Sequence, residues 1–332
     1  MAKTRLVDSF SREHTNLRIS VTDQCNFRCI YCMPEDMEFL EDENIMTLDE
    51  IVHLARIAVD LGINKIRITG GEPLVRRGVP ELIKRLHQLE ELKDISLTTN
   101  GIGLVKQAQD LYDAGLRRIN VSLDTLNAEK FEQMTRRKVL SKVLEGLEEA
   151  QRCGFHPIKV NAVAMRGFTD DEIVDMAKFA RDNAYELRFI EFMPLDADDI
   201  WGRNMYLPGK EIIDKINGVY PLERVQMNGN AKHEPAKRYR FTDGAGDIGV
   251  IASVTEPFCD QCNRVRLTAD GQLRTCLFSI IETDLLTPLR AGASDETIAN
   301  LIIDAVGKKE AGHQINAANF VKPKRNMSMI GG

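Results

Sequence analysis

Short segments of alternating polar and apolar residues, separated by longer helical patterns, constrain the fold of this chain more than any other feature. The strand-like segments are residues 17–22, 65–69, 94–99, 118–124, 158–163 and 187–193. The helical patterns between them are residues 48–62, 79–92, 104–115, 127–154 and 170–183. Such repeats predict a parallel sheet covered by helices, either an open doubly wound sheet or a full or partial barrel. Six units favour an α/β fold with a partial (βα)6 barrel of the TIM type.

Two pairs of residues indicate where helices begin. Thr47 with Glu50, and Thr169 with Glu172, have the spacing of a capping box. We therefore expect one helix to begin after Thr47 and another to begin after Thr169.

The second face of the predicted strands is polar, although parallel strands between helices are normally apolar on both faces. The polar residues are Arg18, Ser20, Thr22, Arg67, Thr69, Ser96, Thr98, Asn120, Ser122, Asp124, Lys159 and Asn161. A solvated outer face is the alternative, but it would require one side of the sheet to lack helices. We favour an inner wall around a polar cavity, because an unpaired buried arginine would otherwise be costly. The basic residues predict that this cavity holds an anion.

The overall charge excludes some classes of partner. The chain has 332 residues, a net charge of −6 and a pI near 5.7. This argues against retention on nucleic acid or membrane by overall charge, so an anionic ligand needs a local cluster of Arg and Lys. Residues 1–10 lack the apolar run of a signal peptide, and no stretch approaches the length of a membrane span. We predict a cytoplasmic protein that binds neither nucleic acid nor membrane.

Three cysteines near the N-terminus form the most unusual local pattern. Cys25, Cys29 and Cys32 have the spacing C-x3-C-x2-C, with no fourth cysteine beside them. In a reducing compartment such thiols are more often ligands or catalysts than disulfides. Closed zinc sites and ferredoxin clusters use four ligands, so three thiolates leave one position of a zinc or iron–sulfur site open. An open position is where a substrate or cofactor binds.

A second group of three cysteines lies near the C-terminus. Cys259, Cys262 and Cys276 have the spacing C-x2-C-x13-C. A zinc ribbon that borrows a distant ligand, such as His233, is one explanation, and a second open cluster is the other. Cys153, at the end of a helical pattern, is predicted to be a buried structural thiol.

The second triad surrounds a predicted hairpin that turns at residues 270–271. Alternation places Arg264 and Arg266 on one face of the hairpin, with Val265 and Leu267 on the other. Paired arginines on a hairpin are usually solvated surface. Beside an open cluster, however, two guanidinium groups would suit a phosphate-bearing substrate.

The first triad follows the first predicted strand, Tyr31 precedes its last cysteine, and residues 70–73 read GGEP at the end of the second strand. In these features the chain resembles the radical S-adenosylmethionine (SAM) superfamily. The resemblance implies a 4Fe–4S cluster whose open iron binds SAM and whose electron cleaves SAM to a 5′-deoxyadenosyl radical. It also implies that the residues in contact with SAM are Tyr31, Gly71, Ser122 and Met193.

The second triad, the R-V-R sequence of residues 264–266 and the terminal pair Gly331 and Gly332 resemble the GTP 3′,8-cyclase family of molybdenum cofactor biosynthesis. The similarity runs from about Leu17 to the last residue. It implies a second 4Fe–4S cluster, and conversion of GTP to (8S)-3′,8-cyclo-7,8-dihydroguanosine 5′-triphosphate by attack of a ribose C3′ radical on C8 of guanine. The implied GTP-binding residues are Arg18, Arg67, Thr98, Lys159, Arg264, Val265 (through its backbone) and Arg266.

The same resemblance implies a division of the chain. Residues 1–230 would form the radical SAM barrel with the first cluster, and residues 231–332 would carry the second cluster and an extension that closes the barrel mouth. The composition of the last twelve residues suits a disordered tail, whereas the resemblance places the Gly-Gly end in the active site. The implied partners are an electron donor of the flavodoxin or ferredoxin type, the next enzyme, cyclic pyranopterin monophosphate synthase, and a second copy in a homodimer.

Two other classes of protein remain open. Another radical SAM enzyme with an auxiliary cluster, for example a peptide-modifying one, usually carries more cysteines than the seven present here. A non-catalytic iron–sulfur or zinc protein would not need a polar barrel interior.

Overall fold

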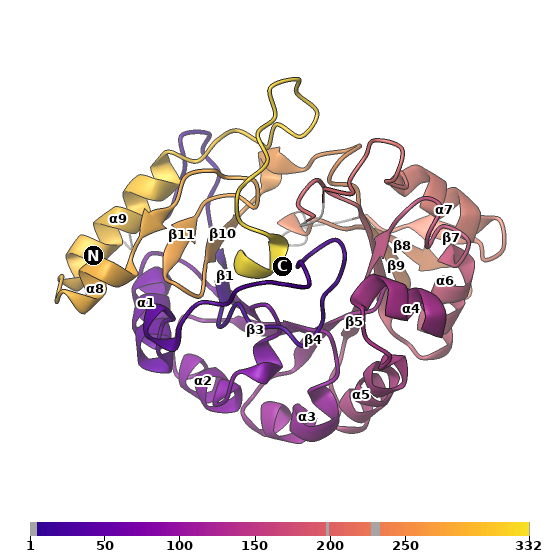
Figure 1. The fold of residues 1–332 in the computed structure, drawn as a ribbon, viewed down its shortest axis with the longest axis horizontal. Helices are drawn as coiled ribbons and strands as arrows, with labels where there is room; N and C mark the ends of the chain where they lie inside the picture. Colours follow the sequence, from indigo (N-terminus) through magenta and orange to yellow (C-terminus); the bar gives the residue numbers. More distant parts are fainter. Residues whose placement is uncertain (1–4, 197–198, 227–232, 332) are drawn as a thin grey trace.

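One curved sheet carries the polar residues singled out above. In the computed structural model, which describes residues 5–196, 199–226 and 233–331, twelve strands join into this sheet (Figure 1). Its centre consists of six parallel strands: β1 (Asn16–Ser20), β2 (Lys65–Thr69), β3 (Asp94–Thr99), β4 (Arg118–Ser122), β5 (Ile158–Ala164) and β6 (Glu186–Glu191). These strands pair in chain order, which confirms the predicted partial barrel.

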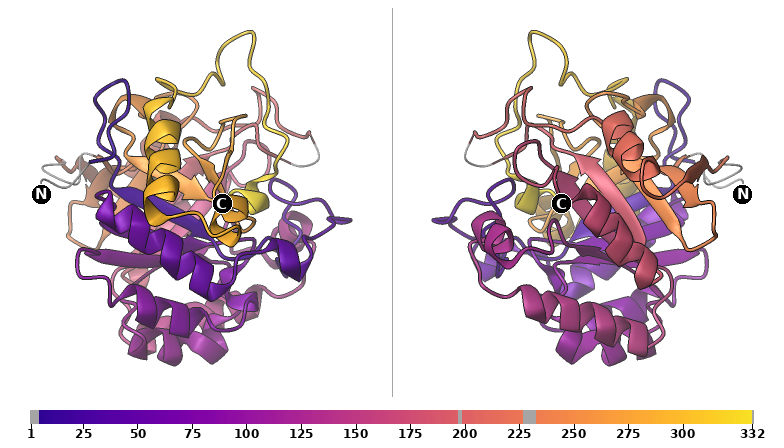
Figure 2. Two further views of the ribbon diagram at one scale, coloured as in Figure 1. Left: turned by 90° about the vertical axis from the view of Figure 1, so that its left-hand side faces the viewer. Right: turned by 90° about the vertical axis from the view of Figure 1, so that its right-hand side faces the viewer.

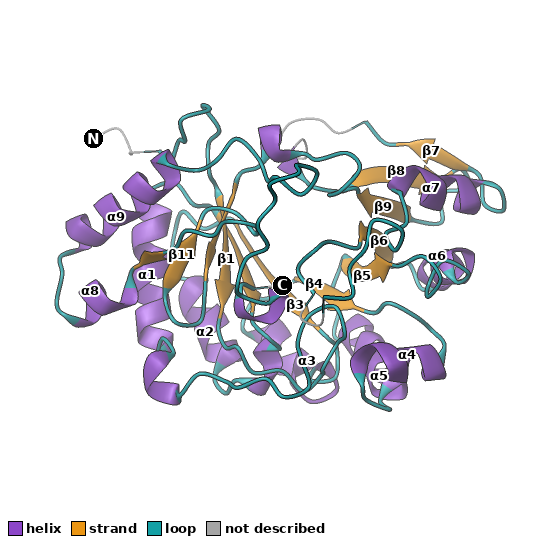
Figure 3. Cartoon of the chain, turned by 45° about the horizontal axis from the view of Figure 1, so that its top comes forward, coloured by secondary structure: helices purple, strands orange, loops and turns teal. Residues whose placement is uncertain are grey.

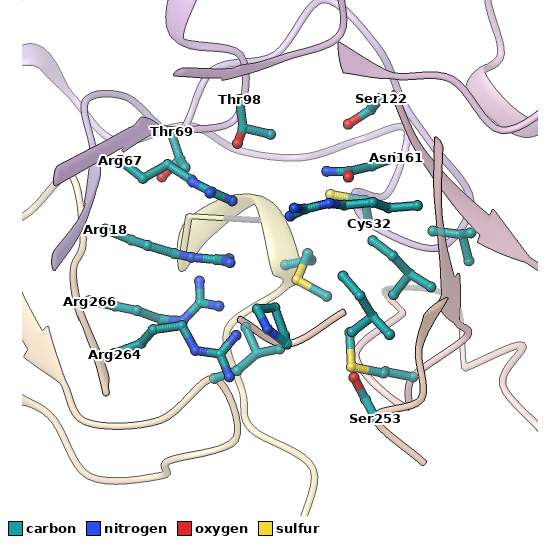
Figure 4. A pocket seen from close by; sticks show the side chains of 18 of the residues that line it. Arg18, Cys32, Arg67, Thr69, Thr98, Ser122, Asn161, Ser253, Arg264 and Arg266 are labelled. Carbon is teal, nitrogen blue, oxygen red and sulfur yellow. The ribbon is translucent and has the colours of Figure 1, made fainter. Parts of the chain in front are cut away.

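Helices cover the outer face of the six strands (Figure 1). They are α1 (Leu48–Asp60), α2 (Val79–Leu86), α3 (Leu104–Asp113), α4 (Ala128–Thr135), α5 (Leu140–Arg152) and α6 (Ile173–Asp182). Outward-facing strand residues such as Ile19, Ile68 and Val121 belong to the apolar core beneath these helices. The alternate residues Arg18 and Arg67 line a cavity inside the barrel (Figure 4). The alternation in the sequence thus reflects an apolar outer layer and a polar inner wall.

One predicted helix start is confirmed and the other is wrong. Thr47 caps α1, because its hydroxyl accepts a hydrogen bond from the Glu50 amide at 3.2 Å while Glu50 accepts from the Thr47 amide at 2.7 Å. The N-cap of α6 is Glu172 instead of Thr169. The Thr169 hydroxyl accepts from the Met165 amide at 2.9 Å, so it stabilises the end of β5 and is not available as a cap.

The predicted helix over residues 127–154 is two helices, α4 and α5. The helix α4 ends at Arg136, which adopts a left-handed backbone conformation with a φ of 58°. Helix propagation stops there because the left-handed conformation is incompatible with another α-helical turn.

The chain after β6 extends both edges of the sheet. Strands β9 (Asp247–Ile251), β8 (Lys237–Phe241) and β7 (Leu222–Arg224) follow β6, and β10 (Arg264–Leu267), β11 (Gln272–Arg274) and β12 (Thr283–Asp284) follow β1. The pairs β6–β9 and β1–β10 are parallel. The hairpin β10–β11 is antiparallel, as predicted, and it buries Val265 and Leu267 on its outer face. Residues distant in sequence therefore extend the barrel at both of its edges.

The remaining helices are α7 (Gly209–Asn217), α8 (Leu286–Arg290) and α9 (Asp295–Gly307), with short 3-10 turns η1 (Asp42–Asn44), η2 (Pro73–Val75), η4 (Cys259–Gln261) and η5 (Met327–Met329). The helix α9 packs against α1 outside the barrel, whereas the last segment crosses the mouth and ends inside (Figures 2 and 3). Within the described residues, no helix combines the length and apolar character needed to cross a membrane.

Candidate active site

A cavity of about 360 Å³ lies inside the barrel and is lined by both cysteine triads. Residues at the carboxyl ends of the parallel strands, among them Thr69, Thr99 and Ser122, are part of its lining, and ligands bind at these ends in barrels of this kind. In Figure 4, Arg18, Arg67, Arg264 and Arg266 lie on one side of this cavity, with Cys32, Ser122 and Asn161 across from them. The predicted polar inner wall is thus confirmed.

The first triad lies in the loop that follows β1. Backbone hydrogen bonds from Arg28 to Thr135 (3.0 Å) and from Ile30 to Met134 (2.9 Å) attach this loop to the end of α4. The Phe27 amide points at the Cys25 sulfur at 3.4 Å, a contact that cluster sulfurs commonly receive. Burial raises the pKa of Cys25 to about 11. Free thiols are costly to ionise there, so binding to a positively charged metal centre would suit them.

The GGEP sequence locks the end of β2 onto the first triad's loop. The Gly71 amide donates to the Thr22 carbonyl and the Glu72 amide to the Gln24 carbonyl, both at 2.7 Å. A Cβ atom on Gly71 would lie 2.3 Å from the Gln24 oxygen, so only glycine permits this approach. The fixed loop brings Gly71 to the cavity beside Cys25.

Glu72 connects the same loop to β3, a role that the sequence did not reveal. Its buried carboxylate accepts from the Thr99 hydroxyl at 2.7 Å and from the Asn100 amide at 2.6 Å. Burial raises the pKa of Glu72 to about 7. An acidic residue within the quoted GGEP sequence was the signal that could have revealed it.

Tyr31 and Asp124 join the first triad's loop to the far wall. The Tyr31 hydroxyl donates to Asp124 at 2.7 Å, and the other Asp124 oxygen accepts from the Val163 amide at 2.8 Å. Burial raises the pKa of Asp124 to about 6. The predicted SAM residues Ser122 and Met193 also line the cavity. The structure therefore brings all four predicted SAM residues to one cavity.

The second triad has a cationic environment. The Cys262 sulfur lies 3.5 Å from an Arg264 nitrogen and 3.7 Å from the Lys309 ammonium. Burial raises the pKa of Cys262, but the positive charges of Arg264 and Lys309 outweigh it and lower this pKa to about 6. The Phe278 amide points at the Cys276 sulfur at 3.5 Å. Nothing near Lys309 in the sequence indicated its position.

Arg12 holds the second triad from outside the cavity. Its guanidinium donates to the carbonyls of Cys259 (2.7 Å), Ala311 (2.6 Å) and Glu310 (2.6 Å), and to the Asp8 carboxylate at 2.6 Å. One side chain near the N-terminus therefore ties together three segments, two of them more than 200 positions away in the sequence. The sequence carried no signal for this contact.

Four arginines form a row along adjacent strands of the inner wall. Arg18 on β1 is in register with Arg67 on β2 and with Arg266 on β10, and Arg264 lies two positions from Arg266. Burial, with repulsion from neighbouring arginines, lowers the pKa of Arg266 to about 9 and that of Arg67 to about 10. This arginine row concentrates positive charge that an anionic ligand would neutralise.

Lys159 and Arg188 add two cationic side chains to the cavity lining, both paired with carboxylates. Lys159 lies 3.3 Å from Glu186, and Arg188 contacts Glu186 at 2.6 Å and Glu234 at 3.0 Å. Burial lowers the pKa of Lys159 to about 8. Arg188 was not predicted, although it is in register with Asn161 and strand alternation could have placed it inside.

The C-terminal tail ends among these residues. One Arg266 nitrogen donates to the carbonyls of Ile330 and Gly331, each at 2.9 Å. Gly331 has a φ of 73°, and a Cβ atom there would lie 2.6 Å from the Thr69 hydroxyl, so glycine suits this position. Gly332 lies outside the described residues. Arg325 anchors the tail through an ion pair with Asp270 at 2.7 Å.

The predicted GTP residues all lie in the described ranges, and the cavity is lined by each of them except Val265. The Val265 side chain is 1% exposed and packs in the core. The zinc ribbon that borrows His233 stays an alternative. His233 lines the same cavity as the second triad and contacts the Gln261 carbonyl at 3.0 Å, although no three His, Cys, Asp or Glu side chains in the described ranges lie close enough together to hold a single metal ion. Cys153 is buried in the core, as predicted.

Comparison with known proteins covers nearly the whole chain. Residues 19–180 match the Radical SAM superfamily model, and residues 185–315 match the model described as Molybdenum Cofactor Synthesis C. The GTP 3′,8-cyclase of Streptomyces coelicolor is 48% identical, over 98% of this chain and 96% of its own length. The enzymes of the same name from Rhodopirellula baltica and Thermodesulfovibrio yellowstonii are 46% and 45% identical, over 98% of this chain and 92% and 99% of their own lengths.

Solved structures agree on the fold. Streptococcus suis SuiB bound to S-adenosylmethionine superposes with a TM-score of 0.62 at 14% identity, covering 87% of this chain and 68% of that protein. SuiB bound to its precursor peptide SuiA gives a TM-score of 0.56, covering 80% of this chain and 60% of that protein.

Proposed function

Because the chain belongs to the GTP 3′,8-cyclase family of radical SAM enzymes, we propose that its cavity binds SAM at the first cysteine triad and GTP beside the second. The enzyme catalyses the first step of molybdenum cofactor biosynthesis, in which GTP becomes (8S)-3′,8-cyclo-7,8-dihydroguanosine 5′-triphosphate. The observation that supports our site assignment most strongly is that both triads and the arginine row line the same cavity.

The first triad suits the SAM half of the reaction. Cys25, Cys29 and Cys32 would hold a 4Fe–4S cluster, and SAM bound there would supply a 5′-deoxyadenosyl radical that removes hydrogen from the substrate. The backbone contacts of the GGEP loop keep Gly71 next to this site. The carboxyl groups of Glu72 and Asp124 line the same end of the cavity, where the negative charge of ionised Asp124 would favour the cationic sulfonium of SAM.

The second triad and the arginine row suit GTP. The guanidinium groups of Arg18, Arg67 and Arg266 would bind the triphosphate, because bidentate contacts to phosphate are their strongest interactions. Arg264, Thr98 and the backbone of Val265 complete this set together with Lys159. A second 4Fe–4S cluster at Cys259, Cys262 and Cys276 would leave an iron site open toward guanine.

Water exclusion is the contribution we assign to the tail. Gly331 contacts Arg266 and lies against Thr69, so the end of the tail occupies space at the carboxyl end of β2, beside the arginine row. A radical confined with GTP needs a site from which water is excluded. We extend this role to Gly332, and we divide the enzyme into a barrel of residues 1–230 and a C-terminal region of residues 231–332.

The reaction also needs partners. We propose a flavodoxin- or ferredoxin-type protein as the electron source, transfer of the product to cyclic pyranopterin monophosphate synthase, and assembly as a homodimer. All seven cysteines are free thiols, a state that a reducing cytoplasm would maintain.

Anaerobic turnover tests this function. The protein is reconstituted with iron and sulfide and supplied with SAM, dithionite and either GTP or ATP; 5′-deoxyadenosine and nucleotide products are then followed by mass spectrometry. We expect 5′-deoxyadenosine to rise with GTP but not with ATP, together with an isomer of GTP. Equal SAM cleavage with GTP and with ATP would overturn the assignment of GTP as the substrate. If a protein that holds about eight irons leaves SAM intact, both cluster assignments are wrong.

A further inference from the structure

A second hollow of about 350 Å³ opens on the outside of the barrel, between η2, the start of α3 and the side of α5. Its apolar lining consists of Leu74, Val75, Ile102 and Val105, and we call it the outer groove. Val75 and Val105 are 40% and 42% exposed, which places two of the large exposed apolar side chains of the described residues on one surface. These two valines give the outer groove a small exposed apolar floor.

The inner end of the outer groove reaches the loop of the first triad. Asn26, which follows Cys25 directly, lines the groove, and its side chain accepts from Asn100 at 2.7 Å. Glu72 lines both the outer groove and the central cavity. A single layer of residues therefore separates the outer groove from the proposed SAM site.

Two partly exposed arginines contact the same loop. Arg137 donates to the Asn26 carbonyl at 3.3 Å, and Arg28 donates to the Cys25 carbonyl at 2.7 Å. The backbone on either side of Cys25 is thus in contact with partly exposed cationic side chains. The loop of the first triad is therefore hydrogen-bonded to side chains that reach the protein surface.

The rim of the outer groove is basic. Lys106 and Lys142 are exposed there, and neither forms an ion pair with any residue in the described ranges. Glu145 is the acidic residue on the rim, while Glu35 nearby is paired with Arg137 at 3.2 Å. Unpaired lysines around an apolar floor are complementary to an acidic protein surface.

We infer that the outer groove is the docking surface for a small acidic protein that carries single electrons. The inference rests on the proposed function, because reductive cleavage of SAM creates the need for an electron at this loop. A shallow groove is sufficient, since complexes for electron transfer are transient and bury less surface than stable ones. The partner's acidic residues would meet Lys106 and Lys142 while its apolar surface covers Val75 and Val105.

The electron count fixes what the partner must supply. The carrier is oxidised by one electron for each SAM that is cleaved. That electron joins one electron of the breaking S–C5′ bond as a lone pair on the methionine sulfur, and the other bond electron remains on the 5′-deoxyadenosyl carbon. The seven cysteines supply no such electron, because under the proposed function six of them are cluster ligands and Cys153 is buried.

Binding and reduction test this docking surface. Reduced flavodoxin, an acidic carrier of single electrons, is titrated into the reconstituted enzyme at low salt, and its affinity and its rate of cluster reduction are measured. The double variant Lys106→Glu/Lys142→Glu should weaken binding and slow reduction on the order of tenfold, and high salt should remove the difference. The matched control Lys308→Glu, an exposed lysine at the end of α9, should behave as the unmodified enzyme.

Dithionite separates this inference from the proposed function. Reduction by dithionite needs no docking, so both variants should be reduced by it at the normal rate and should then cleave SAM. If the double variant also reacts slowly with dithionite, a second variant replaces it. Val105→Gln changes one exposed apolar side chain of the groove, and its affinity for flavodoxin and its rate of cluster reduction are measured in the same way. The docking surface would be overturned if the affinity for flavodoxin and the reduction rate of these variants stayed within twofold of the unmodified enzyme. It would also be overturned if flavodoxin did not reduce the unmodified enzyme. Failure of GTP turnover with dithionite would instead overturn the proposed function.

Discussion

The two cysteine triads have the same number of ligands but opposite electrostatic surroundings. Around the first triad, burial together with the charges of Asp124 and neighbouring cysteines raises the pKa of Cys29. Around the second, Arg264 and Lys309 lower the pKa of Cys262 to about 6 although burial raises it. The acidic end suits a cationic cofactor and the basic end suits a polyphosphate. The comparison teaches that charge, and not ligand number, distinguishes the two sites.

Removal of one cysteine from each triad should separate the two halves of the reaction completely. Cys29→Ala should abolish 5′-deoxyadenosine formation, because the SAM site loses a ligand. Cys276→Ala should abolish cyclisation of GTP while SAM cleavage persists. Each variant should retain about four irons after reconstitution, half of the full complement. Cyclisation at the normal rate in Cys276→Ala would contradict the assignment of the second triad.

Arg12 offers a way to damage the second site without touching its ligands. Arg12→Ala would remove one donor from the buried Asp8 carboxylate, which keeps His14 and the amides of residues 10 and 12, and would remove the donor that three carbonyls share, at a cost of about 1.5–3 kcal/mol in the free energy of unfolding. Thermal unfolding measures this loss, and iron analysis should show that the second cluster is depleted first. Arg12→Lys keeps the charge and should lose less. Equal depletion of both clusters would show that Arg12 stabilises the fold generally.

Arg266→Ala tests the arginine row. A lost charge-assisted hydrogen bond is worth about 1.5–3 kcal/mol, so the KM for GTP should rise roughly tenfold to a hundredfold. SAM cleavage that is not coupled to GTP should remain measurable, because the acidic end is unchanged. Arg152→Ala, which removes an exposed arginine paired with Glu149, is the matched control. Unchanged GTP kinetics would remove Arg266 from the site.

The smallest expected effect is a dependence of GTP affinity on pH. Burial lowers the pKa of Lys159 in the free enzyme to about 8, so this lysine is charged below that pH and neutral above it. Affinity for GTP should therefore be highest below pH 8 and fall by up to about tenfold per pH unit as the pH rises through 8. Equilibrium binding without SAM measures this, and Lys159→Arg should flatten the curve. If the pH curves of the unmodified enzyme and of Lys159→Arg coincide, the pH dependence belongs to another group.

Strand alternation in the sequence was sufficient to predict much of the cavity wall. Arg18, Arg67 and Lys159 were placed inside because side chains alternate across a strand and helices had to cover the other face. Register is a separate matter. Arg18 lies in register with Arg67 because β2 pairs with β1, and in register with Arg266 because β10, 248 positions further along the chain, also pairs in parallel with β1.

The sequence by itself determined the strand–helix repeat, the cysteine spacing and the polar inner face, since each depends on residues that are close together in the chain. Only the tertiary structure decided that Arg12 holds Cys259, that Lys309 lies beside Cys262 and that Gly331 reaches Arg266. These contacts depend on how distant segments pack. Periodicity along a chain carries information about the face on which a residue lies, but not about which distant residue will meet it there.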